Sequence, residues 1–497
     1  MLTLAVLVPL AAALALAALP GATERGARWS AVAGTVASFV LLLAVWAGYE
    51  AGGGFQSVAE VPWVPTLGIA WRVGVDGMSL ALALMSALVF VAAAAWPIRL
   101  DGARAYYAWI LFLTGVSIGL FVALDLVLFY VFFDLSLVGM YFLIGRWGHG
   151  DAQHAALKFF IYTLAGSLLI LIGIIVLALA MPEITFDMRA VIDAPPLPGE
   201  GAVAALVLLA LMVGFGIKTP VFPLHTWLPP AHVDAPGPAS AILAGVLLKM
   251  GTYGMVRLPL QMMPDTFARF ALPIALVGVV SILWGAIVAF AQENLKRRIA
   301  YTSVNHMGYA VLGIAVAGSA AGSATARELA LTGAVVEMVA HGLITGALFL
   351  IAGAFWQRTA DYELSHYGGL AGPAPRLAAA STLAAFASLG LPGLAGFVAE
   401  LHIFIGAFGV YPWLAAVGLL GILVTAALFL GLIRQVFFGE LPAARASFPD
   451  LGRTEAVVLA GMLALVVLIG IWPAWLLEMI DAGGILAAPL AEPGAGG

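Results

Sequence analysis

Long runs of apolar residues, separated by short polar segments, dominate the sequence. An α-helix needs about 20 mostly apolar residues to cross the hydrocarbon core of a bilayer, and runs of that kind occur fourteen times. They cover residues 1–20, 29–50, 77–97, 105–124, 126–145, 155–180, 203–227, 236–258, 270–291, 298–318, 328–356, 375–408, 411–437 and 454–478. The pattern predicts an all-α polytopic membrane protein with about 14 transmembrane helices. The first run lacks a basic leader and a small-residue cleavage site, so we expect a retained helix rather than a signal peptide.

Two of these runs contain helix-breaking residues close to a charge. In the seventh run Lys218 is followed by Pro220, and in the twelfth run Leu391-Pro392-Gly393 precedes Glu400. Broken helices at membrane depth are tolerated only where they line a cavity or are packed in protein. A pair of breaks at corresponding places in two halves indicates inverted repeats. We therefore predict that helices 7 and 12 are broken and that helices 4–8 and 9–13 form two inverted five-helix repeats.

These elements divide the chain into four expected segments. Residues 1–103 form an N-terminal three-helix segment, 104–258 the first repeat, 259–437 the second repeat, and 438–497 the C-terminal helix and tail.

Composition narrows the possible classes of protein further. Only 9% of the residues are charged and 63% are hydrophobic, whereas a soluble domain carries roughly 25% charged residues. The net charge of −5 argues against nucleic-acid binding, which needs a basic stripe. The absence of cysteine excludes disulfides, thiolate zinc sites and Cys-ligated iron–sulfur clusters.

The distribution of Lys and Arg between the runs predicts the orientation. If residue 1 lies outside, the inside loops hold fourteen of these cations and the outside loops hold five. The five are Arg72, Arg189, Arg257, Arg269 and Arg327. Because cytoplasmic loops are enriched in Lys and Arg, we expect an integral protein of a bacterial inner (plasma) membrane with both termini on the non-cytoplasmic side.

Ionisable side chains within the runs are few. Because such groups are costly in a bilayer, each is a functional hypothesis. They are Asp134, Lys218, Lys249, His306, Glu337, His341 and Glu400, with His225 near the end of the seventh run. Groups of this kind hold or release a proton according to their neighbours, so the series predicts a proton relay. The alternative for each is a structural role in a salt bridge or an interhelical hydrogen bond.

Other polar residues have simpler interpretations. The spacing of Glu337 and His341 permits a local pair on one helix face. Asp125 is expected to cap the fifth helix. The Lys296-Arg297-Arg298 run is expected to be a cytoplasmic orientation signal and helix cap. For His225 and His232 a structural role at the interface and a role in proton uptake are both open.

The same residues lie in stretches that resemble the antiporter-like proton-translocating subunits of NADH–quinone oxidoreductase (respiratory complex I), chain M or mitochondrial subunit 4 type. The resemblance rests on these stretches: 131–134 (VFFD), 140–149 (MYFLIGRWGH), 217–232 (IKTPVFPLHTWLPPAH), 243–254 (LAGVLLKMGTYG), 294–308 (NLKRRIAYTSVNHMG), 338–342 (MVAHG) and 389–400 (LGLPGLAGFVAE). The chain M type is favoured because no long lateral helix follows the fourteenth run.

The resemblance implies a role for each position. Lys218 matches the lysine of helix seven, Lys249 the connecting lysine of helix eight, His306 and His341 the central histidines, and Glu400 the terminal acid. Asp134 stands where the family has a glutamate, and its shorter side chain makes a water-mediated contact with Lys218 possible. The family's subunits bind no cofactor, so none is expected here, nor a metal. The expected partners are other membrane subunits, including related antiporter-like ones, and lipid; no nucleic acid is expected.

Three alternatives remain at this stage. The chain could be a subunit of a multi-subunit Na⁺/H⁺ antiporter, which shares this fold and residue set. It could be the membrane subunit of an energy-converting hydrogenase or a related ion-coupled assembly. It could also be a structural spacer without transport, although the cost of the intramembrane charges argues against that.

Overall fold

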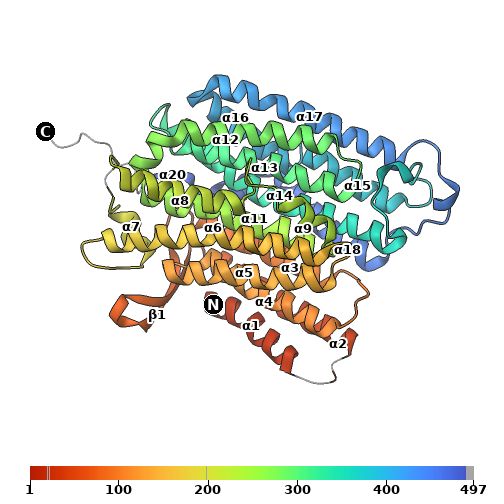
Figure 1. Cartoon of the computed structure of the whole chain (residues 1–497), viewed down its shortest axis with the longest axis horizontal. Helices are drawn as coiled ribbons and strands as arrows, with labels where there is room; N and C mark the ends of the chain where they lie inside the picture. The colour runs from red at the N-terminus through yellow and green to blue at the C-terminus, as the bar shows by residue number, and fades with distance from the viewer. Residues whose placement is uncertain (19–20, 22, 198, 488–497) are drawn as a thin grey trace.

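The computed structural model describes residues 1–18, 21, 23–197 and 199–487, and it is a bundle of long helices that run along the longest axis of the molecule (Figure 1). Every predicted apolar run is occupied by helix. The principal helices are α1 (Leu2–Ala18), α2 (Glu24–Ala47), α3 (Gly77–Ala95), α4 (Ala103–Val122), α5 (Leu126–Trp147), α6 (Ala152–Ala180), α8 (Ala202–Lys218), α12 (Pro264–Phe290), α13 (Leu295–Ala317), α14 (Ala324–Thr359), α17 (Pro412–Phe437) and α18 (Arg453–Ile471).

The length of these helices confirms the membrane class. Within the described part of the chain, ten helices are long and apolar enough to cross a membrane, while α1, α8 and α16 (Ala395–Val410) are apolar but shorter. The count of fourteen spans and the inverted repeats stay predictions.

Both predicted helix breaks are confirmed. Helix α8 ends at Lys218, and the short helix α9 (Leu228–Asp234) begins only after the Pro-containing segment. Helix α15 (Pro375–Ser388) likewise ends before the Pro-Gly pair, and α16 follows it. Proline removes a backbone donor and clashes with the preceding helical turn, so the sequence itself accounts for the two breaks.

A third irregularity was not predicted. Between Gly237 and Leu260 the helix consists of α10 (Gly237–Ile242), a π-helical turn η2 (Leu243–Leu247), α11 (Leu248–Met255) and a second π-helical turn η3 (Val256–Leu260). This helix and α14 are the two predicted spans that are buried over their full apolar window. They form the centre of the bundle, and π-turns of this kind occur frequently at functional sites.

The structure also contains an antiparallel β-hairpin, which the all-helical prediction did not include. Strand β1 (Gln56–Val64) pairs with β2 (Ile69–Val75), and β2 packs against the turn between α4 and α5. The hairpin lies at the same end of the bundle as α7 (Met188–Asp193) and α20 (Ala482–Ala487) (Figure 1). This end is called the hairpin end below, and the charge distribution predicts that it faces away from the cytoplasm.

Asp125 caps α5, as predicted. Its Oδ1 accepts hydrogen bonds from the backbone N–H groups of Val127 and Leu128 at 3.0 and 3.2 Å. Its Oδ2 also accepts a bond from Arg72 at 3.0 Å, so the cap ties the hairpin to the helical bundle.

Candidate functional site

Lys218 lies in the last turn of α8 and is 1% exposed. Its Nζ donates a hydrogen bond to Ser136 Oγ at 3.0 Å and lies 4.9 Å from the centre of the Phe133 ring. The expected Asp134–Lys218 pair is not a direct one, because no contact within 4.0 Å joins these two described side chains. Asp134 Oδ1 is instead buried without a hydrogen-bond partner in the described structure.

Ser136 is a site residue that the sequence did not identify. Replacing Ser136 with alanine removes the hydroxyl that accepts the bond from the buried Lys218 ammonium. We expect this variant to lose about 1–3 kcal/mol of stability, the usual cost of an unsatisfied buried polar group, and to pump more weakly. Thermal unfolding and proton transport of the assembled complex measure both effects. Ser117→Ala is the control, since the buried Ser117 hydroxyl has no hydrogen-bond partner; equal losses in both variants would contradict the assignment.

Lys249 lies at the start of α11, directly after the π-turn. Its Nζ contacts His341 Nδ1 at 2.5 Å and donates to the carbonyl of Ala244, a residue of the π-turn. The broken end of α8 packs directly on this helix. A Cβ at Gly251 would lie 2.3 Å from Thr219 Oγ1 and 2.8 Å from the Phe215 carbonyl oxygen. This close approach brings the segment carrying Lys218 against the helix carrying Lys249.

His306, on α13, connects Lys249 with the second broken helix. Its ring lies 5.5 Å from the ring of His341, centre to centre. Its Nδ1 is 3.2 Å from Glu337 Oε1, and its Nε2 is 3.0 Å from the hydroxyl of Ser388. The local Glu337–His341 pair that the spacing permits is therefore not formed. Each of these two residues turns to a different helix, Glu337 to α13 and His341 to α11.

Glu400 is 5% exposed and lies across the break from Ser388, the last residue of α15. Its carboxylate occupies the space beside Gly390, where an added Cβ would come within 2.1 Å of Glu400 Oε2. The chain of polar groups thus runs from Lys218 through Lys249, His341 and His306 to the break that holds Glu400.

His225 lies outside this series. It accepts a hydrogen bond from Trp284 Nε1 at 3.3 Å and packs near Phe222 and Tyr301. It contacts no other residue of the predicted relay in the described structure.

The basic run 296–298 lies in the first turn of α13, whose N-cap is Asn294, and the side chain of Lys296 is fully buried; the role of this run as an orientation signal stays a prediction. Lys296 donates to the carbonyl of Ala235 and lies 5.5 Å from the centre of the Tyr362 ring. Burial, with the positive charge of Lys296, lowers the pKa of His149 in the α5–α6 loop from its ordinary value to about 4. His232 is also fully buried, with both ring nitrogens unpartnered, and stacks on Phe349 at 4.3 Å.

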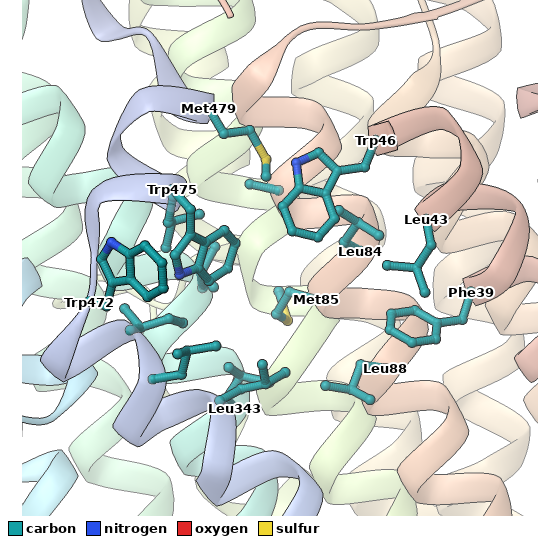
Figure 2. Close-up of a pocket in the computed structure, with 16 residues that line it drawn as sticks. Phe39, Leu43, Trp46, Leu84, Met85, Leu88, Leu343, Trp472, Trp475 and Met479 are labelled. Atoms are coloured by element: carbon teal, nitrogen blue, oxygen red, sulfur yellow. The ribbon is translucent and has the colours of Figure 1, made fainter. Parts of the chain in front are cut away.

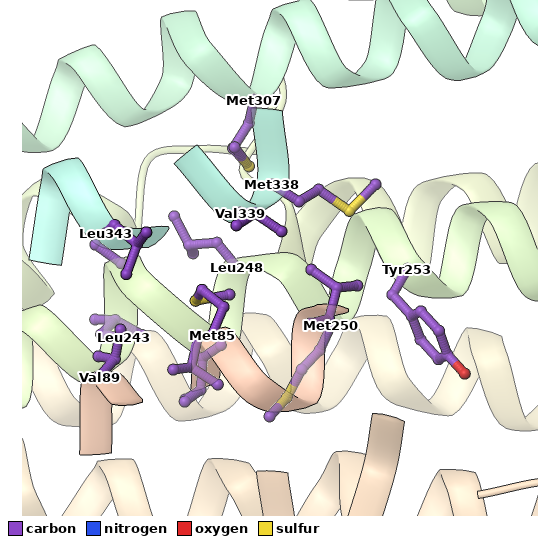
Figure 3. Close-up of a cluster of buried hydrophobic side chains, with 14 of the residues drawn as sticks. Met85, Val89, Leu243, Leu248, Met250, Tyr253, Met307, Met338, Val339 and Leu343 are labelled. Atoms are coloured by element: carbon purple, nitrogen blue, oxygen red, sulfur yellow. The ribbon is translucent and has the colours of Figure 1, made fainter. Parts of the chain in front are cut away.

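Apolar side chains insulate the polar series. Apolar residues of the helices that carry this series and of α3 form a buried cluster, among them Met85, Leu248, Met307 and Val339 (Figure 3). A cavity of about 390 Å³ between α2, α3 and α18 is lined by apolar and aromatic residues such as Phe39, Trp46 and Trp475, and by no ionisable side chain (Figure 2). Such a low-dielectric surrounding strengthens the electrostatic coupling between buried groups.

No metal site is found in the described ranges, since no three His, Asp or Glu side chains gather there as potential ligands. The structure is a helical membrane bundle with two broken helices and a buried series of lysine, histidine and carboxylate groups. These features are typical of membrane proteins that move ions.

Comparison with known proteins identifies the family. Residues 123–427 match the family described as NADH:quinone oxidoreductase/Mrp antiporter, transmembrane, and the chain belongs to this family. It is 38% identical to an NAD(P)H-quinone oxidoreductase chain 4 of Picosynechococcus sp., over 95% of this chain and 89% of the relative. It is 39% identical to a chain 4 of Thermosynechococcus vestitus, with the same coverage.

Solved structures agree with this assignment. A chain in respiratory complex I from Thermus thermophilus with bound NADH matches with a TM-score of 0.87 and 32% identity, covering 98% of this chain and 99% of that one. A chain of the Mrp complex from Dietzia sp. matches with a TM-score of 0.86, 23% identity and coverage of 99% and 97%. At this lower identity the second likeness shows the shared fold alone.

Proposed function

We propose that this chain is a proton-translocating, non-redox membrane subunit of a complex I-type NADH–quinone oxidoreductase. The observation that carries the proposal is the buried Lys249–His341 contact, which joins the two broken helices through His306. Chain 4 relatives at 38–39% identity support the parent complex over a Na⁺/H⁺ antiporter. The bacterial inner membrane, with both termini on the non-cytoplasmic side, remains our prediction from the charge distribution.

In the proposed mechanism, redox energy released in other subunits changes the charge state at one end of the series. A charge change near Asp134 alters the affinity of Lys218 for its proton, because charges buried in a low-dielectric interior influence one another strongly. The proton then moves through Lys249, His341 and His306 to Glu400. Glu337, whose Oε1 lies 3.2 Å from His306 Nδ1, sets the charge state of that histidine. No step in this chain requires a bound cofactor.

The test of this proposal is Lys218→Ala in the assembled complex, reconstituted into vesicles and supplied with NADH and quinone. We expect NADH-driven proton uptake to fall by roughly tenfold, since a positioned proton donor is lost. NADH oxidation by an artificial acceptor reports that the redox subunits are intact. Lys158→Ala is the control, because this lysine lies partly exposed on α6. Proton uptake at the wild-type ratio in Lys218→Ala would contradict the proposal.

A further inference from the structure

A buried arginine network occupies the hairpin end of the central helix, two turns beyond Lys249. Arg257 was counted among the loop cations in the sequence, but it lies in η3 and its side chain is fully buried. Its guanidinium donates to Asp76 Oδ1 at 2.5 Å, to Tyr253 Oη at 3.1 Å and to Gln261 Oε1 at 3.1 Å. The relay described above uses none of these residues.

The residues that bond to Arg257 also form hydrogen bonds with other groups of the protein. The Tyr253 hydroxyl donates to the carbonyl of Phe121 at 3.1 Å and points away from the apolar cluster (Figure 3). The amide of Gln261 donates to the carbonyl of Ile485 at 3.0 Å. Asp76 caps α3 by accepting a bond from Ser79 N at 2.9 Å. All three partners of Arg257 thus also bond to other protein groups, and the hydroxyl proton of Tyr253 is already engaged.

A cavity of about 430 Å³ reaches this network from the hairpin end. Its lining includes Asp76 and Gln261 themselves, and also Asp193, Asp481 and Arg189. Three carboxylates and one guanidinium give it an excess of negative charge, which raises the local concentration of cations, protons included. Lys249 lies about 12 Å farther along the helix, at 1.5 Å per residue.

We propose that Arg257 is a proton barrier that separates the acidic cavity at the hairpin end from Lys249. A buried arginine remains protonated and cannot pass a proton on, and a fixed positive charge repels a proton that approaches along the helix. A proton on Lys249 is therefore directed sideways to His341 rather than out along α11. The inference rests on the proposed function, because a barrier is needed only if Lys249 carries protons.

The test measures passive proton permeability of vesicles that contain the assembled complex, under an imposed pH gradient and without NADH. Arg257→Gln is expected to raise this permeability by roughly tenfold, since the repelling charge is gone. In the double variant Arg257→Gln/Lys249→Met we expect the proton permeability to return to the wild-type level, because the leak would pass through Lys249. A leak that persists in the double variant, or a tight single variant, would overturn the proposal.

Two further variants separate a charge barrier from a loss of packing. Arg72→Gln breaks another buried ion pair at the same end, that with Asp125, and is expected to stay tight; an equal leak there would also overturn the proposal. Arg257→Lys keeps the charge and most of the volume but can release its proton, so a leak is expected. If Arg257→Gln does not assemble, wild-type permeability in Arg257→Lys is the overturning result.

These measurements are independent of the test of pumping. If Lys218→Ala pumps normally while Arg257→Gln leaks through Lys249, the proposed relay fails and the barrier stands. If Lys218→Ala stops pumping and Arg257→Gln remains tight, the barrier fails and the relay stands.

Discussion

Replacing Lys249 with methionine is expected to reduce NADH-driven proton pumping by roughly tenfold, the effect of removing a positioned proton-transfer group. Lys249 contacts His341 at 2.5 Å and lies on the helix against which the broken end of α8 packs. No other described lysine contacts His341. Methionine is similar in length and apolar, so it fills the same space without binding a proton.

Lys249→Arg separates the charge of Lys249 from its ability to release a proton. Arginine keeps the positive charge but stays protonated in proteins, so this variant is also expected to stop pumping. Lys158→Met, on α6, makes the same chemical change away from the series and is expected to pump normally. The measurement is proton uptake per NADH oxidised by the reconstituted complex. Normal pumping by Lys249→Arg would show that Lys249 acts only as a fixed charge.

Gly390→Ala is expected to disable the far end of the relay without removing any ionisable group. An added Cβ would lie 2.1 Å from Glu400 Oε2, a distance at which the carboxylate must move. Because proton transfer needs donor and acceptor within hydrogen-bond reach, we expect pumping to fall by roughly tenfold. Proton uptake by the reconstituted complex measures the effect.

Gly393→Ala is the matched control for this substitution. Both glycines have left-handed backbone angles, with φ of +76° and +89°, so alanine costs each about 1–2 kcal/mol. Nothing lies within 4 Å of a Cβ at Gly393. We expect both variants to lose stability similarly and only Gly390→Ala to lose pumping. Equal loss of pumping in both would show that backbone strain, not displacement of Glu400, is responsible.

The features that follow from local sequence were predicted well. The apolar runs, the breaks near Pro220 and Pro392, and the cap at Asp125 depend on residues close in the chain, and all are present. The π-turns beside Lys249 were missed, although Gly245 lies in η2 and Pro259 in η3, because a single glycine or proline inside an apolar run does not specify a π-turn. The hairpin at residues 56–75 was also missed; its two strands pair with each other, and a single bridge from Val73 to Ala123 joins β2 to the end of α4.

Pairing between charged groups was the least predictable feature. Spacing along one helix suggested a Glu337–His341 contact, yet each side chain bonds to a different helix. The sequence placed Lys296 in a cytoplasmic basic run and Arg257 among the outside-loop cations, yet both side chains are fully buried. Burial of both depends on which helices and loops pack over them, and no local pattern carries that information.

The sequence by itself determined that this is a polytopic helical membrane protein with a short series of intramembrane ionisable groups. The free energy of moving a helix from water into a bilayer depends mainly on its composition and length. Membrane-spanning segments can therefore be recognised from the sequence alone. Only the tertiary structure decided which of those groups meet: Lys249 with His341, His306 with Glu337, and Arg257 with Asp76. Helix packing decides which residues tens of positions apart come into contact. A buried charged group is stable only where the fold places a polar or charged partner beside it.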